Sequence, residues 1–174
     1  KGLLKYAAIG LSALTLTSCA KQEQKTPKYV FYLILDGCGV NTVLGEEMYQ
    51  SELEGKIGRN PTLMAQFPVV SVASTFSASN GITDSAASGT ALASGVKSYN
   101  GAMGVDTDTI PVYSIASWAK DAGKLVGVGS SVCINHATPA AQYAHQKSRN
   151  HYYEIGLDLA ASGFDFFGAS DFNQ

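Results

Sequence analysis

The sequence predicts an α/β fold: a mostly parallel central sheet with helices on both faces, in three layers. Segments typical of strands alternate along the chain with segments typical of helices. The first, residues 29–35 (YVFYLIL), is a continuous apolar run of the kind found in strands buried on both faces of a parallel sheet. The 174 residues, net charge of −2 and hydrophobic content of 45% fit one ordinary globular unit, and no basic patch indicates a nucleic-acid partner.

The other elements follow in chain order. Strands are predicted at residues 29–35, 69–76, 125–130 and 164–167. Helices are predicted at residues 84–94, 111–122, around 139–144 and at 152–161. Pro111 suits a first helical turn, and Gly95 and Gly123 are typical stops after the first two helices. The many small residues between positions 71 and 104 indicate tight packing of a helix on the sheet around a site.

The N-terminus differs from the rest of the chain. Residues 1–18 place lysines beside a short apolar segment that ends in Leu-Thr-Ser before Cys19, which resembles a bacterial lipobox and predicts a lipoprotein signal peptide. An ordinary cleaved signal or a retained anchor is the alternative. Residues 19–28 are polar and predict a tether, and residues 29–174 form the folded part. We therefore expect an exported protein, anchored to a membrane through lipid on Cys19 and facing the periplasm or the cell surface.

The other two cysteines carry no functional signal. Cys38 and Cys133 lack the spacing of metal ligands and lie in apolar, strand-like contexts. Export would permit a disulfide, but buried free thiols are favoured.

The segment TDSAAS at residues 83–88 is the most informative one. It places Ser85 where a helix should begin, with Asp84 beside it and no histidine nearby. A helix start offers unpaired N–H groups and a partial positive charge, which suit a phosphate. A serine without a general base needs another activator, and a metal ion is the obvious candidate.

Further candidate groups follow predicted strands. Asp36 ends the first strand, Ser85 follows the second, and His136 and Thr138 follow the third. Ligands collect at the carboxyl ends of parallel strands, so these groups should converge on one edge of the sheet. Taken singly, each has an ordinary alternative: a turn acid, a helix cap, a loop histidine and a helix start. Arg149 is either a solvated charge or a bidentate phosphate ligand.

Five blocks in this order strongly resemble alkaline phosphatases. They are LDGCG at 35–39, TDSAAS at 83–88, GVKSYNGA at 95–102, NHATPAA at 135–141, and YAH at 143–145 with Arg149. The resemblance extends from about Tyr29 to Gly168 and implies the N-terminal part of an alkaline phosphatase-like fold. It implies hydrolysis of phosphate monoesters, and it leaves a homodimer open.

The resemblance implies a role for each matching residue. Ser85 matches the nucleophile that becomes a phosphoserine, and Arg149 grips two oxygens of the phosphoryl group while Asp84 helps to place it. Asp36 matches a carboxylate shared between zinc and magnesium, and Thr138 matches a magnesium ligand. One zinc ion would lower the hydroxyl pKa of Ser85, and a second would activate the water that releases phosphate.

There are two departures from the family pattern. Position 136 is histidine, whereas the best-known bacterial members carry aspartate there; animal-type members share the histidine. His136 would therefore bind magnesium more weakly or indirectly than a carboxylate. The family's members run on past this point and supply most zinc ligands from their second half, and neither His145 nor His151 matches those ligands. We therefore expect this chain to be the N-terminal portion of a longer protein and inactive alone.

Three rival functions remain at this point. A phosphodiesterase or sulfatase relative of the same superfamily would usually carry threonine or a modified cysteine as nucleophile, unlike Ser85. A non-catalytic lipoprotein could keep the pocket for phosphate binding only. An acyl serine hydrolase is disfavoured, because neither Gly-x-Ser-x-Gly nor a suitable histidine–acid pair occurs.

Overall fold

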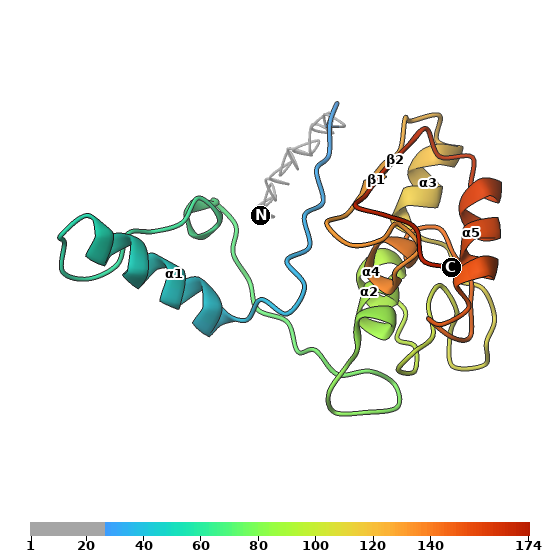
Figure 1. Ribbon diagram of the computed structural model, residues 1–174, viewed down its shortest axis with the longest axis horizontal. Coiled ribbons are helices and arrows are strands. Elements are labelled where there is room, and N and C mark those ends of the chain that lie inside the picture. The colour runs from blue at the N-terminus through green and yellow to red at the C-terminus, as the bar shows by residue number, and fades with distance from the viewer. Residues whose placement is uncertain (1–26) are drawn as a thin grey trace, which may run out of the picture. The chain divides into compact units, whose positions relative to one another are not determined.

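The computed structural model describes residues 27–174, so the predicted signal peptide, Cys19 and nearly all of the tether lie outside the described residues. Residues 27–34 belong to one unit and Leu35–Gln174 to another. The elements are α1 (Val40–Leu53), the 3-10 helix η1 (Met64–Gln66), α2 (Ser85–Ser94), α3 (Ile115–Asp121), β1 (Gly127–Gly129), α4 (Ala137–Ala140), α5 (Tyr152–Ala161) and β2 (Phe166–Gly168) (Figure 1). None of the helices in this described part combines the length and apolar character that a membrane crossing requires.

The two strands form a parallel pair. Val128 lies opposite Phe167, with Gly127 opposite Phe166 and Gly129 opposite Gly168. Parallel neighbours need a long crossover connection, and here α4 and α5 lie within it. The predicted α/β class with a parallel sheet is therefore confirmed.

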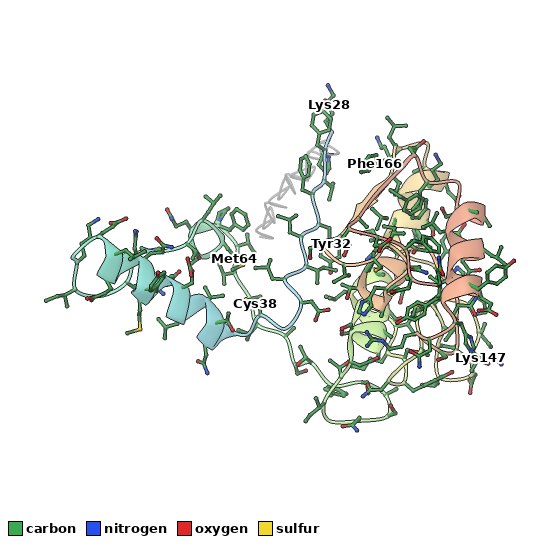
Figure 2. All side chains as sticks on the ribbon, viewed as in Figure 1. Lys28, Tyr32, Cys38, Met64, Lys147 and Phe166 are labelled. Carbon is green, nitrogen blue, oxygen red and sulfur yellow. The ribbon has the colours of Figure 1, made fainter. Side chains whose placement is uncertain are left out.

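Two predicted strands are wrong. Residues 29–35 and 69–76 form no strand, and most of their apolar side chains are exposed, with Phe31 at 85% and Val69 at 83%. A central strand must pair its N–H and C=O groups with neighbours, and no described segment forms a ladder with either run. Apolar character alone therefore did not suffice to make a strand. Figure 2 shows the same exposure at Phe166, whose side chain is 64% exposed although it lies in β2.

The predicted helices were located with varying accuracy. Helix α5 has the predicted bounds, and α2 begins after its cap Asp84 and ends at Gly95, which has the left-handed φ of 75°. Helix α3 begins at Ile115 rather than Pro111, because the Ser114 hydroxyl accepts a hydrogen bond from the Ser117 amide and caps the helix there. Helix α4 is shifted to Ala137–Ala140, and α1 was not predicted.

Small side chains allow α2 and α4 to approach each other. A Cβ placed on Gly89 of α2 would lie only 2.8 Å from the Cβ of Ala141, just after α4. The surrounding core contains apolar side chains at most 4% exposed: Ala86, Met103, Ala137, Ala140, Ala141, Tyr143, Ala144 and Ile155. The predicted tight packing is present, but the partner of α2 is a helix rather than a sheet. This approach brings the start of α2 close to the start of α4.

The two described cysteines, Cys38 and Cys133, are free thiols, as expected, although both are half-buried rather than buried.

Gly104 occupies a position that no other residue can fill without movement. Its φ is 62°, and an added Cβ would lie 1.8 Å from the carbonyl oxygen of Ala144. We expect Gly104→Ala to lower the free energy of unfolding by at least about 3 kcal/mol, since it combines left-handed strain with a backbone clash. Chemical denaturation measures this loss. Gly123→Ala is the matched control, because Gly123 has a φ of 75° but no atom within 4 Å of the added Cβ, and it should cost only about 1 kcal/mol. Equal losses would contradict the clash.

Candidate functional site

The first part of the site is the start of α2. The Oδ1 atom of Asp84 accepts a hydrogen bond of 3.0 Å from the Ala87 amide, which caps the helix. Ser85 is the first helical residue and is half-buried. As at any helix start, its N–H and that of Ala86 lack an acceptor within the helix. Ser85 therefore lies at the end of α2 where the main-chain N–H groups of the first turn have no acceptor within the helix.

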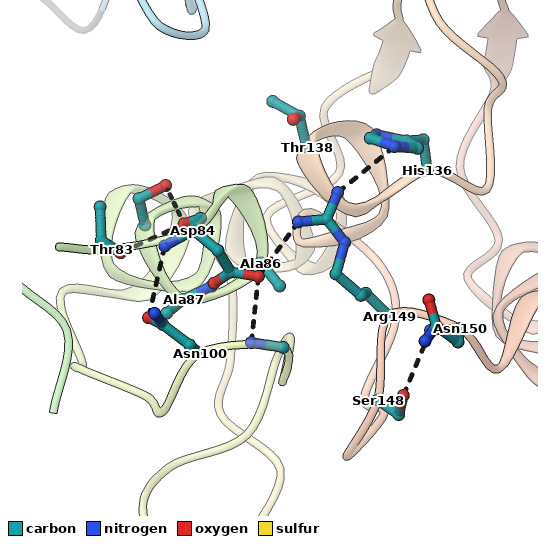
Figure 3. A network of polar contacts seen from close by, with 12 residues as sticks. Thr83, Asp84, Ala86, Ala87, Asn100, His136, Thr138, Ser148, Arg149 and Asn150 are labelled. Atoms are coloured by element: carbon teal, nitrogen blue, oxygen red, sulfur yellow. Dashed lines mark hydrogen bonds and ion pairs between the residues drawn. The ribbon is translucent and has the colours of Figure 1, made fainter. Parts of the chain in front are cut away.

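The second oxygen of Asp84 joins the helix start to two distant segments. Oδ2 accepts hydrogen bonds from the Gly101 amide at 3.0 Å and from Nη1 of Arg149 at 3.1 Å (Figure 3). Burial by itself would raise the pKa of Asp84, but the amides of Ala87 and Gly101 and the Arg149 guanidinium outweigh it and hold that pKa below its ordinary value. Asp84 is therefore a carboxylate at neutral pH, and it neutralises the arginine beside it.

Arg149 is fixed at both ends. Its main-chain amide donates to the Gly101 carbonyl at 2.6 Å, and its Nη2 lies 3.3 Å from Nε2 of His136 (Figure 3). A guanidinium can only donate, so Nε2 of His136 is the acceptor in this contact and the proton of the neutral ring lies on Nδ1. Burial lowers the pKa of His136 and the Arg149 cation lowers it further, while the Asp36 carboxylate acts in the opposite direction. His136 is therefore neutral at physiological pH.

The third part of the site joins residues far apart in the sequence. The hydroxyl of Thr138, on α4, donates a hydrogen bond of 2.8 Å to Oδ2 of Asp36. Thr138 lies two residues after His136, at the same end of α4 (Figure 3). Asp36 is exposed and follows a segment without regular secondary structure, not the strand that was predicted before it. A side-chain hydrogen bond, and not a shared edge of a sheet, therefore brings Asp36 and Thr138 together.

The structure brings together most of the candidate residues. Asp84, Arg149 and His136 form one chain of contacts, and Thr138 with Asp36 forms a second pair beside His136. Ser85 lies next to Asp84 in the sequence, and no hydrogen bond joins its hydroxyl to another described residue. Sequence reasoning assigned no role to Asn100 and Gly101, although they lie in the GVKSYNGA block that signalled the family.

The available ligands suit magnesium better than zinc. Asp36 and Thr138 offer oxygen atoms 2.8 Å apart, and magnesium prefers a few oxygen ligands completed by water. Nδ1 of His136 is buried and has no hydrogen-bond partner among the described residues. Because this nitrogen carries the ring proton, it can donate a hydrogen bond, for example to a water molecule, but it cannot ligate a metal ion directly. Residues 27–174 contain no group of three or more His, Cys, Asp or Glu side chains that could hold a metal ion. The residues present therefore fit part of a magnesium site, and they do not form a zinc site.

Comparison with known proteins identifies a family that this chain resembles. The sequence model of the alkaline phosphatase family matches residues 27–171. The alkaline phosphatase of Gadus morhua is 38% identical over 164 residues, covering 87% of this chain and 34% of that protein. The cold-active alkaline phosphatase of a psychrophilic Shewanella species is 38% identical with a TM-score of 0.69, covering 76% of this chain and 33% of that one.

A further solved structure carries a metal ion. A variant of the alkaline phosphatase of the Antarctic bacterium TAB5, solved with magnesium bound, is 35% identical with a TM-score of 0.60 and covers 70% of this chain and 35% of that one. The chain spans about a third of the length of these relatives. The match of the family along nearly all described residues, together with the fold, shows that this chain belongs to the alkaline phosphatase family.

Proposed function

We propose that this chain supplies the nucleophile and the phosphate-binding arginine of an enzyme that hydrolyses phosphate monoesters through a phosphoserine on Ser85. Membership of the alkaline phosphatase family supports phosphomonoester hydrolysis as the reaction class. The single observation that carries the proposal is the Asp84–Arg149 ion pair, because it holds a guanidinium beside the helix start where Ser85 lies. A phosphoryl transition state needs charge neutralisation and alignment more than proton transfer, and this arrangement offers both.

Each residue of the site has a defined part in the proposed reaction. Asp84 stays ionised and keeps Arg149 in one orientation, with the Gly101 carbonyl holding the arginine main chain. The guanidinium N–H groups that do not face Asp84 or His136 can donate to two oxygens of the phosphoryl group. Ser85 attacks phosphorus, and the alcohol of the ester leaves. Water then hydrolyses the phosphoserine, so that phosphate is released and the serine is regenerated.

The Ser85 hydroxyl has no described base that could take its proton. In the proposed enzyme Asp36 and Thr138 would hold magnesium, and His136 would contribute to that site only weakly or indirectly. Asp36 would also contribute to a zinc site whose other ligands are not found among the described residues. The two zinc ions and one magnesium ion of the family, when bound, supply positive charge and a lowered hydroxyl pKa. We accordingly propose that these 174 residues alone do not hydrolyse phosphate esters.

The location of the protein is also part of the proposal. Residues 1–18 are proposed to be a cleaved lipoprotein signal, Cys19 the lipidated residue, residues 19–28 the tether and residues 29–174 part of the phosphatase domain. The lipobox-like LTSC sequence supports this, and mass spectrometry of the mature N-terminus tests it.

Substitution of Ser85 tests the nucleophile directly. When the protein made from the complete reading frame is incubated with a phosphomonoester at mildly acid pH and quenched, we expect phosphoserine at Ser85, and Ser85→Ala should abolish it. Peptide mass spectrometry locates the phosphate. Ser88→Ala is the matched control, since its hydroxyl is committed to the Asp84 carbonyl at 2.7 Å in the same helix and the label should persist. A phosphate found elsewhere in the chain would overturn the assignment.

Substitution of Arg149 tests the phosphate site. We expect Arg149→Ala to weaken inhibition by inorganic phosphate by about 1–3 kcal/mol and to slow turnover, because one charged hydrogen-bonding partner is lost. Inhibition constants measured at constant ionic strength give the loss. Arg149→Lys keeps the positive charge but lacks the planar guanidinium, so its inhibition constant for phosphate should lie between those of wild type and Arg149→Ala. Phosphate inhibition that is the same in all three proteins would remove Arg149 from the site.

A further inference from the structure

Asn100 forms hydrogen bonds through both polar groups of its side chain and through its main-chain amide. All three bonds go to the segment that leads into α2. Its Nδ2 donates to the Ile82 carbonyl at 2.9 Å, and its Oδ1 accepts from the Asp84 amide at 3.3 Å. Its own amide donates to the Ser79 hydroxyl at 3.0 Å. Figure 3 shows the carboxamide beside Asp84 at the start of α2. These contacts span 16 to 21 residues of sequence, so they fix a chain that has folded back on itself.

The carboxamide acts on the main chain on both sides of Thr83. It pairs with the carbonyl before this residue and with the amide after it, as a neighbouring strand would. Asp84 has the extended conformation that such pairing requires, with a φ of −102° and a ψ of 176°. Because Ser85 is the next residue, the direction in which the chain enters α2 depends on this side chain.

Gly101, the neighbour of Asn100, acts on the arginine. Its amide donates to Oδ2 of Asp84, the same oxygen that Arg149 contacts, and its carbonyl accepts from the Arg149 amide. Two consecutive residues thus hold the two halves of the site. Asn100 holds the chain that leads to Ser85, and Gly101 holds Arg149.

We propose that Asn100 is a positioning residue for the nucleophile, which sets where Ser85 lies relative to the phosphate held by Arg149. The inference rests on the proposed phosphomonoesterase function and adds a residue whose carboxamide is engaged by the Ile82 carbonyl and the Asp84 amide. Loss of the Asn100 carboxamide should misalign Ser85, while the contacts of Arg149 with Asp84 and Gly101 remain. The rate of the chemical step should therefore suffer more than phosphate binding.

The experiment compares Asn100→Ala with wild type, using protein made from the complete reading frame and p-nitrophenyl phosphate as substrate. We expect kcat to fall by about tenfold or more, since small misplacements of a reacting group cost that much, and the inhibition constant for inorganic phosphate to change by less than about threefold. Asn80→Ala is the matched control. Its Oδ1 accepts from the Ile82 amide at 2.9 Å in the same segment before α2, but no hydrogen bond joins it to Asp84 among the described residues, so kcat should stay within about twofold of wild type.

Three results would overturn the proposal: an unchanged kcat in Asn100→Ala, a parallel loss of kcat and phosphate inhibition, or an equal loss of kcat in Asn80→Ala. If Asn100→Ala does not fold, Asn100→Asp replaces it. This variant keeps the size and the acceptor for the Asp84 amide but loses the donor to Ile82, and it should show the same pattern to a smaller extent.

Hydrogen exchange separates this proposal from the proposed function. The Asp84 amide should exchange faster in Asn100→Ala than in wild type or Asn80→Ala, whether or not the protein hydrolyses esters. An inactive wild-type protein would contradict the phosphatase function, whereas unchanged exchange at Asp84 would contradict the positioning role of Asn100.

Discussion

The ion pair between Asp84 and Arg149 is the interaction on which the site depends. Its oxygen and nitrogen are 3.1 Å apart, and the two side chains are only 22% and 27% exposed, so each charge is partly removed from water and needs the other. Asp84 also caps α2, and therefore one carboxylate fixes the helix start and the arginine at once. This double use explains why an acid lies next to the candidate nucleophile.

Close packing of main chain makes this interaction geometrically attainable. Gly89 lets α2 approach Ala141, and that approach brings His136 and Thr138 at the start of α4 toward the start of α2. Gly101 then links Asp84 and Arg149, because its N–H donates to the Asp84 carboxylate and its carbonyl accepts from the Arg149 amide. The small residues of this chain are therefore part of the site as well as of the core.

Features set by local signals could be predicted from the sequence. Helix α2 carries its own cap and its own glycine stop and was located correctly, and α5 was predicted with its observed bounds. The start of α3 was misplaced, because the Ser114 cap outweighed the Pro111 signal. The runs at 29–35 and 69–76 were predicted as strands from their local residue types, but a strand also needs partners, and no described segment supplies them.

In the candidate site, too, residues within local motifs could be predicted, and residues that depend on tertiary contacts could not. Asp36, Ser85, His136, Thr138 and Arg149 could be selected from motifs in which each residue type suits phosphate or metal chemistry. Asn100 could not be selected in this way, because its contacts with Ile82 and Asp84 depend on how the chain folds back. Its residue type alone indicates only a turn.

The pKa of the Asp84 carboxyl group tests most directly whether this ion pair organises the site. Carbon-detected NMR of the Asp84 side chain across an acid titration would give this pKa in the wild-type protein and in Arg149→Ala. We expect a wild-type pKa below that of an ordinary aspartate, about 3.9, and a clear rise toward that value when the guanidinium is removed. A wild-type value at or above the ordinary one, or no rise in the variant, would contradict the account.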